Sequence, residues 1–278
     1  MKREAILNYY IYNGEKCSTD SIEVFDNIIS PIIYEVIRII DGIPLFLEDH
    51  LERFRKSLDL LGVKLEKSDE EIKAEIFELI KINKCNQMNV KLLCSNLYEK
   101  EQDFFVYFVK SHYPEPFLYK KGIHTILFYS ERENPNAKVL NTSLRECVNE
   151  AIKKADAYEA LLVNEDGYIM EGSRSNMFFV KKDVVYTAPA KDVLLGVTRN
   201  YIMKVCKMLN IKVVEKAIHE KEIASLDGAF MSGTSVNVLP IKSIDKIKMD
   251  SVDNQVINKI LEGYLNEMKD YIKSQTAR

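Results

Sequence analysis

The stretch from Lys138 to Asn176 constrains the fold of this 278-residue chain more than any other part of its sequence. Ser143 and Glu146 stand at the spacing of a capping box, a pair that satisfies backbone amides at the start of a helix. Apolar residues then recur every three or four positions over 144–152, which places them on one helix face. The pattern predicts an amphipathic helix directly after Lys138.

A hairpin is indicated after this helix. The run 160–163 is apolar and short, as in a buried strand, and the segment 164–167 ends in Asp-Gly, a typical hairpin turn. The returning strand ends at Glu171. A compact helix–hairpin unit of this kind can bring the amine of Lys138 and the carboxylate of Glu171 to one cleft.

Both charged residues also have ordinary interpretations, because a lysine before a helix and a glutamate at a strand end are usually solvated. The run Glu171-Gly172-Ser173-Arg174-Ser175-Asn176 favours a functional role, since a glycine and small hydroxyls let a flat ligand approach the backbone. A lysine, an acid and a phosphate-binding segment together suit pyridoxal 5'-phosphate. The lysine forms a Schiff base, and the acid keeps the pyridine nitrogen protonated.

Composition excludes several classes of function. The formal charge is 39 minus 42, or −3, and no apolar run is long enough for a membrane span, so we expect no nucleic-acid or membrane partner. Residues 1–4 lack the apolar core of a signal peptide. The five cysteines and four histidines follow no metal-ligand spacing. We expect a cytoplasmic protein with reduced cysteines and no metal.

Residues 1–112 are expected to form a small domain of antiparallel hairpins and two helices. Strands are predicted over 5–12, 22–25, 32–40, 90–94 and 104–109, and helices over about 48–61 and 69–82. The strand 32–40 alternates, with Tyr34 and Arg38 on one face and Glu35 on the other. Arg53 lies beside the buried stripe of the first helix, where an arginine is usually a surface charge.

A linker over 113–119 is expected to lead to a larger domain over 120–278. Its predicted strands are 123–128, 160–163, 168–171, 177–180, 184–186 and a pair around 230–240, and a last helix covers about 253–272. Gly196-Val197-Thr198-Arg199 opens another helix, whose first amides form a potential anion site, although such a start is more often an ordinary capped helix. Ser232-Gly233-Thr234 is a small-residue turn that can supply a second edge of a phosphate site.

Taken together, these motifs resemble the class IV aminotransferases, the fold-type IV pyridoxal-phosphate enzymes. This family includes branched-chain and D-amino-acid aminotransferases and aminodeoxychorismate lyase. The resemblance extends from about Tyr34 to Asp245 and rests on seven runs in the family's order. They are Tyr34-Glu35-Val36-Ile37-Arg38, His50-Leu51-Glu52-Arg53, Lys138-Val139-Leu140-Asn141, Glu159-Ala160-Leu161-Leu162, Glu171-Gly172-Ser173 with Asn176, Gly196-Val197-Thr198-Arg199 and Ser232-Gly233-Thr234.

The resemblance implies an α+β, two-domain fold, with a small α/β domain, a larger pseudo-barrel domain and the cofactor at the domain interface. It also implies a role for individual residues. Lys138 matches the catalytic Schiff-base lysine, Glu171 matches the acid on the pyridine nitrogen, and Arg53 matches the phosphate-binding arginine. The other implied cofactor-binding residues are Tyr34, Ser173, Val197, Thr198 and Thr234.

The indications about substrate conflict. Arg38, Lys91 and Ser235 match substrate-binding positions, although Lys91 stands only near an arginine of the branched-chain enzymes. The Lys-x-x-Asn spacing at Lys138 resembles the D-amino-acid and lyase branches instead. Arg174 replaces the small residue often found near the cofactor ring, and its role stays open.

The main hypothesis is therefore a homodimeric aminotransferase that moves an amino group between an amino acid and a 2-keto acid. An aminodeoxychorismate lyase is the alternative within enzymes. A non-catalytic dimeric homologue is the remaining alternative, and the presence of Lys138, Glu171 and the whole predicted phosphate site argues against it.

Overall fold

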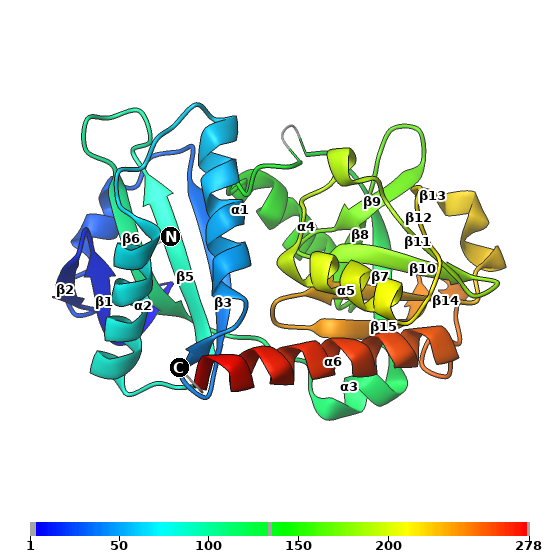
Figure 1. Cartoon of the computed structure of the whole chain (residues 1–278). Coiled ribbons are helices and arrows are strands. Elements are labelled where there is room, and N and C mark those ends of the chain that lie inside the picture. Colours follow the sequence, from blue (N-terminus) through cyan, green and yellow to red (C-terminus); the bar gives the residue numbers. More distant parts are fainter. Residues whose placement is uncertain (1–3, 133–134, 277–278) are drawn as a thin grey trace. The chain divides into compact units, whose positions relative to one another are not determined.

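The computed structural model describes residues 4–132 and 135–276 as a mixed α/β fold of two compact units (Figure 1). The first unit consists of Met1–His112, Ala137–Leu140 and Asp270–Arg278, and the second of Tyr113–Asn136 and Asn141–Lys269. The α+β fold class is confirmed. The division assigns the short segment that contains Lys138 to the first unit, which no sequence pattern indicated.

The first unit is built on a six-stranded sheet in the order β2-β1-β6-β5-β3-β4, with antiparallel pairing throughout. Its elements are β1 (Ala5–Tyr12), β2 (Glu15–Ser18), the 3-10 helix η1 (Glu23–Asn27), β3 (Ile33–Ile40), β4 (Ile43–Pro44), α1 (Leu47–Leu60), α2 (Asp69–Asn83), β5 (Met88–Ser95) and β6 (Asp103–Val109).

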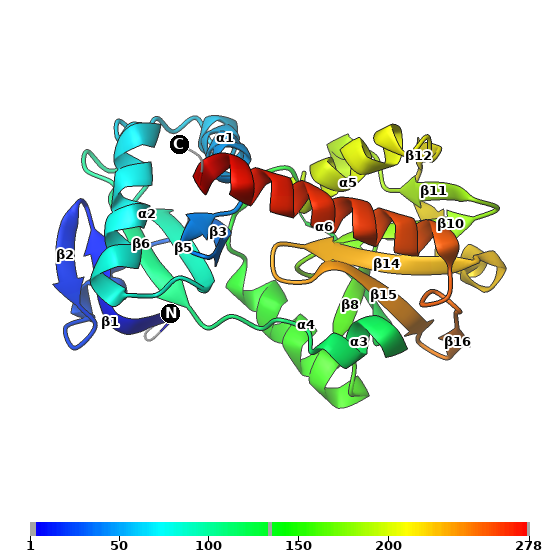
Figure 2. The ribbon, with the colours of Figure 1, turned by 60° about the horizontal axis from the view of Figure 1, so that its bottom comes forward.

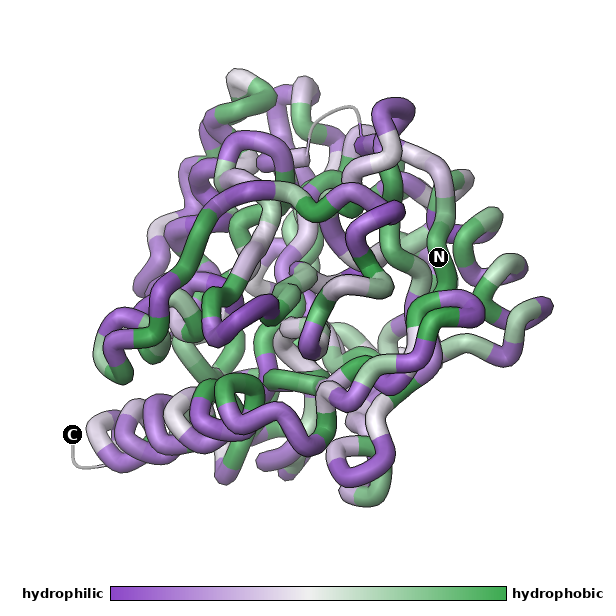
Figure 3. The backbone as a smooth tube through the Cα atoms, turned by 90° about the vertical axis from the view of Figure 1, so that its right-hand side faces the viewer, coloured by the Kyte–Doolittle hydropathy of each residue, from purple (hydrophilic) through white to green (hydrophobic). Residues whose placement is uncertain are grey.

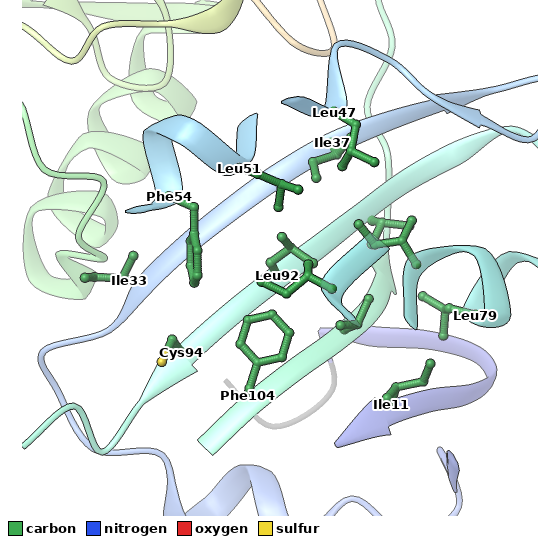
Figure 4. Close-up of a cluster of buried hydrophobic side chains, with 14 of the residues drawn as sticks. Ile11, Ile33, Ile37, Leu47, Leu51, Phe54, Leu79, Leu92, Cys94 and Phe104 are labelled. Carbon is green, nitrogen blue, oxygen red and sulfur yellow. The ribbon is translucent and has the colours of Figure 1, made fainter. Parts of the chain in front are cut away.

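Helices α1 and α2 cover one face of this sheet. Phe54 and Leu51 of α1 face Leu92 and Phe104 of the strands, and Leu79 of α2 belongs to the same buried cluster (Figure 4). The cluster includes Ile33, Ile37 and Ile39 of β3, which lie on the face opposite Tyr34. The opposite face carries Tyr34 and a second, more aromatic cluster.

The second unit holds a sheet in the order β12-β11-β10-β14-β15-β7-β8-β9-β13, with β16 paired to β15. Part of it forms a half-barrel. The elements are α3 (Pro116–Lys121), β7 (Ile123–Tyr129), α4 (Thr142–Ala155), β8 (Glu159–Val163), β9 (Tyr168–Gly172), β10 (Asn176–Lys181), β11 (Val184–Thr187), the 3-10 helix η2 (Ala190–Asp192), α5 (Val197–Met208), β12 (Val213–Glu215), β13 (Ile218–His219), the 3-10 helix η3 (Glu220–Ser225), β14 (Gly228–Gly233), β15 (Asn237–Ile244) and β16 (Ile247–Lys248). The last helix, α6 (Gln255–Thr276), belongs to this unit up to Lys269 and to the first unit from Asp270 on.

Helix α4 connects the parallel strands β7 and β8 and packs on them. Its Val148 is buried with Ala160 and Leu162 of β8, and Leu144 is partly buried against the same cluster. The long helix α6 is visible from a second direction in Figure 2. Its course toward the C-terminus alternates between hydrophilic and hydrophobic residues in Figure 3, as expected for a helix with one buried face.

Several local predictions are wrong. Residues 22–25 are not a strand, since Ile22 is the N-cap of η1 and residues 23–25 belong to η1, and β1 pairs instead with β2. Helix α4 is capped by Asn141, whose side-chain oxygen accepts from the amide of Leu144 at 3.0 Å, and not by a Ser143–Glu146 box. Cys147, expected in the buried stripe, is exposed. Helix α3 (Pro116–Lys121) overlaps the segment 113–119 that was predicted as a linker.

The absence of a signal peptide was inferred partly from residues 1–3, which lie outside the described residues. Within residues 4–132 and 135–276, no helix is long and apolar enough to cross a membrane.

Candidate active site

The backbone of Lys138 is fixed within the first unit. Its carbonyl accepts from the amide of Tyr34 at 3.2 Å, and its own amide donates to the hydroxyl of Ser57 in α1 at 3.1 Å. The next residues continue this pairing, with Val139 bridging to Ile33 of β3. The backbone of Lys138 is therefore hydrogen-bonded to both strand β3 and helix α1.

The amine of Lys138 lies 4.7 Å from the centre of the Tyr34 ring. The same ring has the amine of Lys91 at 5.3 Å. Lys91 is buried and forms an ion pair with Glu4, and it stands opposite Val36 in the β3–β5 pairing. The structure thus brings Tyr34, Lys91 and Lys138 together at the aromatic face of the first sheet, with two ammonium groups near one ring.

Arg53 is buried rather than a surface charge. Its Nε donates to Oε1 of Glu35 at 2.7 Å and its Nη2 donates to Oε2 at 2.6 Å. His50 places Nδ1 2.8 Å from the same Oε2. This bidentate ion pair between Arg53 and Glu35 fixes the plane of the guanidinium. Sequence reasoning did not single out Glu35 as the partner of Arg53, although the alternation of β3 placed it on the face opposite Tyr34.

The charges of this cluster are well defined. Burial alone would raise the pKa of Glu35, but Arg53 and His50 outweigh it and lower that pKa to about 2. Burial lowers the pKa of His50 and outweighs the opposite effect of Glu35, while Arg53 and Lys138 lower this pKa further. Near neutral pH, the cluster therefore combines an ionised carboxylate, a guanidinium and a neutral imidazole.

Glu171 is the buried acid of the second unit. It stands near the end of β9 and is 3% exposed. Nε of Arg132 lies 3.1 Å from its Oε1, and the amide of Leu194 donates to its Oε2 at 3.4 Å. Nη2 of Arg132 donates to the carbonyl of Ser173 at 2.8 Å. Arg132 lies in a polar loop without periodicity, so no sequence pattern marked it as a partner of Glu171.

The carboxylate of Glu159 binds the turn after Glu171 through two hydrogen bonds. The hydroxyl of Ser173 donates to Oε1 of Glu159 at 2.6 Å, and that of Ser175 donates to Oε2 at 3.1 Å. The amide of Ser173 donates to the carbonyl of Ala160 at 2.9 Å. Both donors of Ser173 are thus used within the protein, so this residue shapes the turn. The guanidinium of Arg174 donates to Asn149 of α4.

Two further predicted segments lie beside this turn. Gly196 is the N-cap of α5 and, as a glycine, has no side chain to cap that helix end. A Cβ on Gly196 would lie 2.2 Å from Oδ1 of Asn176, and a Cβ on Gly233 would lie 3.7 Å from the carbonyl of Arg174. The structure thereby places two glycines of the second unit, Gly196 and Gly233, near the turn that follows Glu171. The predicted residues Val197, Thr198, Thr234 and Ser235 directly follow these glycines in the sequence.

Three comparisons identify the family. Residues 32–244 match the family model described as amino-transferase class IV. The chain is 26% identical to the D-alanine aminotransferase of Bacillus licheniformis over 88% of its length and 89% of that protein. It is 31% identical to a probable branched-chain-amino-acid aminotransferase of Rickettsia felis over 84% of each chain.

Solved structures show the same fold. The branched-chain amino acid aminotransferase of T.th., solved with pyridoxamine 5'-phosphate, has a TM-score of 0.84 at 22% identity, covering 96% of each chain. A putative 4-amino-4-deoxychorismate lyase from Legionella pneumophila has a TM-score of 0.75 at 20% identity, covering 88% of this chain and 92% of that one. The chain belongs to the class IV aminotransferase family. It is a pyridoxal-phosphate-dependent enzyme, as the resemblance implied.

The side chains of both units have the chemistry that this cofactor requires. The first unit offers a primary amine on Lys138 and a fixed guanidinium on Arg53. The second unit offers the buried carboxylate of Glu171 and the start of α5, where the N-cap residue is a glycine. An amine suits the aldehyde, a carboxylate suits the pyridine nitrogen, and helix amides suit the phosphate. In the described part of the chain, no group of three His, Cys, Asp or Glu residues is placed to hold a metal ion.

Proposed function

We propose that this enzyme transfers an amino group between an amino acid and a 2-keto acid, with Lys138 as its catalytic base. The observation that carries the proposal is the placement of Lys138, whose backbone is tied to Tyr34 and Ser57 while its amine lies over the Tyr34 ring. A residue fixed in this way can present its amine repeatedly to the same reacting carbon.

Each residue has a distinct role in the proposed reaction. Nζ of Lys138 would hold the cofactor through its aldehyde group, and the amine, once released, would take the proton from Cα of the substrate. The carboxylate of Glu171 would keep a proton on the pyridine nitrogen by favouring the charged form of that nitrogen. The cofactor supplies an electron sink for the electrons left on Cα.

The phosphate is proposed to bind charged and hydrogen-bonding groups in each unit. In the first unit, Arg53 presents a guanidinium whose plane is set by Glu35. In the second unit, the amides of Val197 and Thr198 open α5, and the hydroxyl of Thr234 stands in the turn after β14. Tyr34 is proposed to pack against the cofactor.

The amino donor is proposed to be a branched-chain or D-amino acid. The named relatives support both types, since one is a D-alanine enzyme and another is a probable branched-chain enzyme. Arg38, Lys91 and Ser235 are the proposed substrate-binding residues. Because the amine of Lys91 pairs with Glu4, a substrate carboxylate that binds there has to replace the Glu4 carboxylate.

Aminodeoxychorismate lyase is the second candidate. It is supported by the fold of the Legionella protein and by the Lys-x-x-Asn spacing at Lys138. That spacing is weaker support than the sequence suggested, because Asn141 has a structural task as the N-cap of α4.

A half-reaction separates the two candidates. With an aminotransferase, an amino donor alone is expected to bleach the visible band of the cofactor and release one keto acid per site, and a keto acid is expected to restore the band. The measurement is absorbance across a panel of L- and D-amino acids. Release of pyruvate and 4-aminobenzoate from aminodeoxychorismate, with no donor able to bleach the cofactor, would establish the lyase instead.

Replacement of Arg53 by alanine is expected to weaken cofactor binding about ten-fold or more, since a hydrogen bond to a charged group contributes roughly 1.5–3 kcal/mol. The loss is expected to be specific to the phosphate, so titrations of the apoenzyme compare pyridoxal phosphate with pyridoxal. Arg53→Lys is expected to restore only part of the affinity, because lysine lacks the planar fork.

Two controls accompany this experiment. Lys56→Ala removes a positive charge from the exposed side of the same helix and is expected to leave both affinities unchanged. Arg53→Ala/Glu35→Gln removes the carboxylate charge that the single change leaves buried without its arginine partner. Equal binding of pyridoxal phosphate by Arg53→Ala and the unmodified enzyme would refute the assignment.

The active form is further proposed to be a homodimer, as the family resemblance implied, and its location is proposed to be the cytoplasm, as the cysteine usage indicated. All five cysteines are free, which suits a reducing compartment. Light scattering of the holoenzyme measures the mass, and a value near the 32.2 kDa of one chain would contradict the dimer.

A further inference from the structure

Asn176 has a buried carboxamide with a specific contact. It is the first residue of β10, is 5% exposed, and pairs with Ser232 of β14. Its Nδ2 donates to the carbonyl of Leu194 at 2.8 Å. This carboxamide therefore reaches from the turn after Glu171 to the segment that leads into α5.

The same carboxamide determines which residue can stand at Gly196. The backbone of Gly196 has an ordinary φ of −63°, so its conformation does not require glycine. Space does, because a Cβ would lie 2.2 Å from Oδ1 of Asn176, far closer than atoms of this kind approach. Asn176 thus holds the N-cap of α5 at a distance that only a glycine allows.

Leu194 connects this contact to Glu171. Its carbonyl accepts from Asn176, and its amide donates to Oε2 of Glu171. Glu171 and Asn176, which stand on either side of the turn 172–175, therefore bind the amide and the carbonyl of Leu194, respectively. Asn136 fixes the preceding segment as well, since its Nδ2 donates to the carbonyls of Ala190 and Val193 at 2.9 and 2.6 Å.

We infer that Asn176 is a positioning residue that aims the first amides of α5 at the cofactor phosphate. It acts through Leu194 and Gly196 and does not itself touch the cofactor. This inference rests on the proposed function, because it takes the phosphate bound at Val197 and Thr198 as its object.

The chemistry of the carboxamide explains why a neutral side chain stands here. An amide nitrogen can donate to the Leu194 carbonyl, whereas a carboxylate oxygen in its place would face that carbonyl with like charge. A carboxylate at this position would also put a negative charge beside the helix end that favours an anion. Asn176→Asp keeps the shape of the side chain, but it removes the donor to the Leu194 carbonyl and adds a negative charge beside the start of α5.

The test compares the affinities of the apoenzyme for pyridoxal phosphate and for pyridoxal, measured by titration. Asn176→Asp is expected to lower the affinity for pyridoxal phosphate about ten-fold or more, with little change for pyridoxal. Asn210→Asp makes the same change just beyond the other end of α5, at an exposed position, and is expected to leave both affinities unchanged.

A second measurement tests the contact itself and needs no ligand. Gly196→Ala is expected to lower the melting temperature of the apoenzyme. The decrease is expected to be smaller when Asn176→Ala is also present, because the smaller side chain leaves room for the added methyl group. Additive decreases would show that the two residues do not constrain each other.

The outcomes separate this inference from the function on which it rests. If the unmodified enzyme binds pyridoxal phosphate and pyridoxal equally, the proposed phosphate position fails and the inference fails with it. If the unmodified enzyme prefers pyridoxal phosphate and Asn176→Asp keeps the full preference, only the positioning role of Asn176 is overturned.

Discussion

Lys138→Ala is expected to keep its fold and to lose turnover by roughly 10²- to 10⁴-fold through the missing base alone. The fold is expected to survive because the contacts to Tyr34 and Ser57 that tie this segment use the backbone of Lys138. Turnover is measured in the steady state, and the fold by circular dichroism and thermal melting.

Covalent labelling gives this prediction a second readout. Borohydride reduction of the unmodified holoenzyme is expected to add the cofactor mass to the peptide that contains Lys138, and Lys138→Ala is expected to lack that label. Lys154→Ala, at an exposed position of α4, is the matched control and is expected to keep both label and turnover. A label on another lysine of the unmodified enzyme would place the base elsewhere.

Glu171→Gln is expected to retain the cofactor and to slow removal of the Cα proton on the order of 10²- to 10³-fold. A neutral amide does not favour the protonated pyridine nitrogen as a carboxylate does. The change also deprives Arg132 of its ionic partner at 3.1 Å, so that a positive charge remains at this position. That charge disfavours the protonated nitrogen further.

Stopped-flow absorbance with a single donor measures this step directly. Substitution of deuterium at Cα of the donor is expected to slow Glu171→Gln, because proton removal then limits the half-reaction. Glu165→Gln makes the same change at an exposed position of the β8–β9 turn and is expected to react as the unmodified enzyme does. A normal rate in Glu171→Gln would remove this acid from the proposed mechanism.

Periodicity predicted the buried faces well where one face of an element meets the core. The alternation over β3 separated Tyr34 from Glu35, and the structure has that same order. In α6, Val256, Ile260, Tyr264 and Met268, which recur every four positions, are buried. These patterns are readable because burial of a continuous face repeats along the chain.

Local signals were less reliable where two of them competed. Ser143 and Glu146 have the spacing of a capping box, yet Asn141 caps α4, and its side-chain oxygen also accepts from the hydroxyl of Ser143 at 3.0 Å. The segment Ile22-Glu23-Val24-Phe25 had no partner strand, because β1 pairs with β2 on one side and β6 on the other. A strand needs such a partner, which local sequence does not specify.

The sequence by itself determined the family and the local form of each candidate segment, including the glycine at the start of α5 and the acid that ends the β8–β9 hairpin. Only the tertiary structure decided the partners of these groups. Glu35 meets Arg53 across 18 positions, and Arg132 reaches the carbonyl of Ser173 across 41. Contacts between residues so far apart in the sequence depend on how strands and loops pack. The periodicity of a single sequence does not predict them.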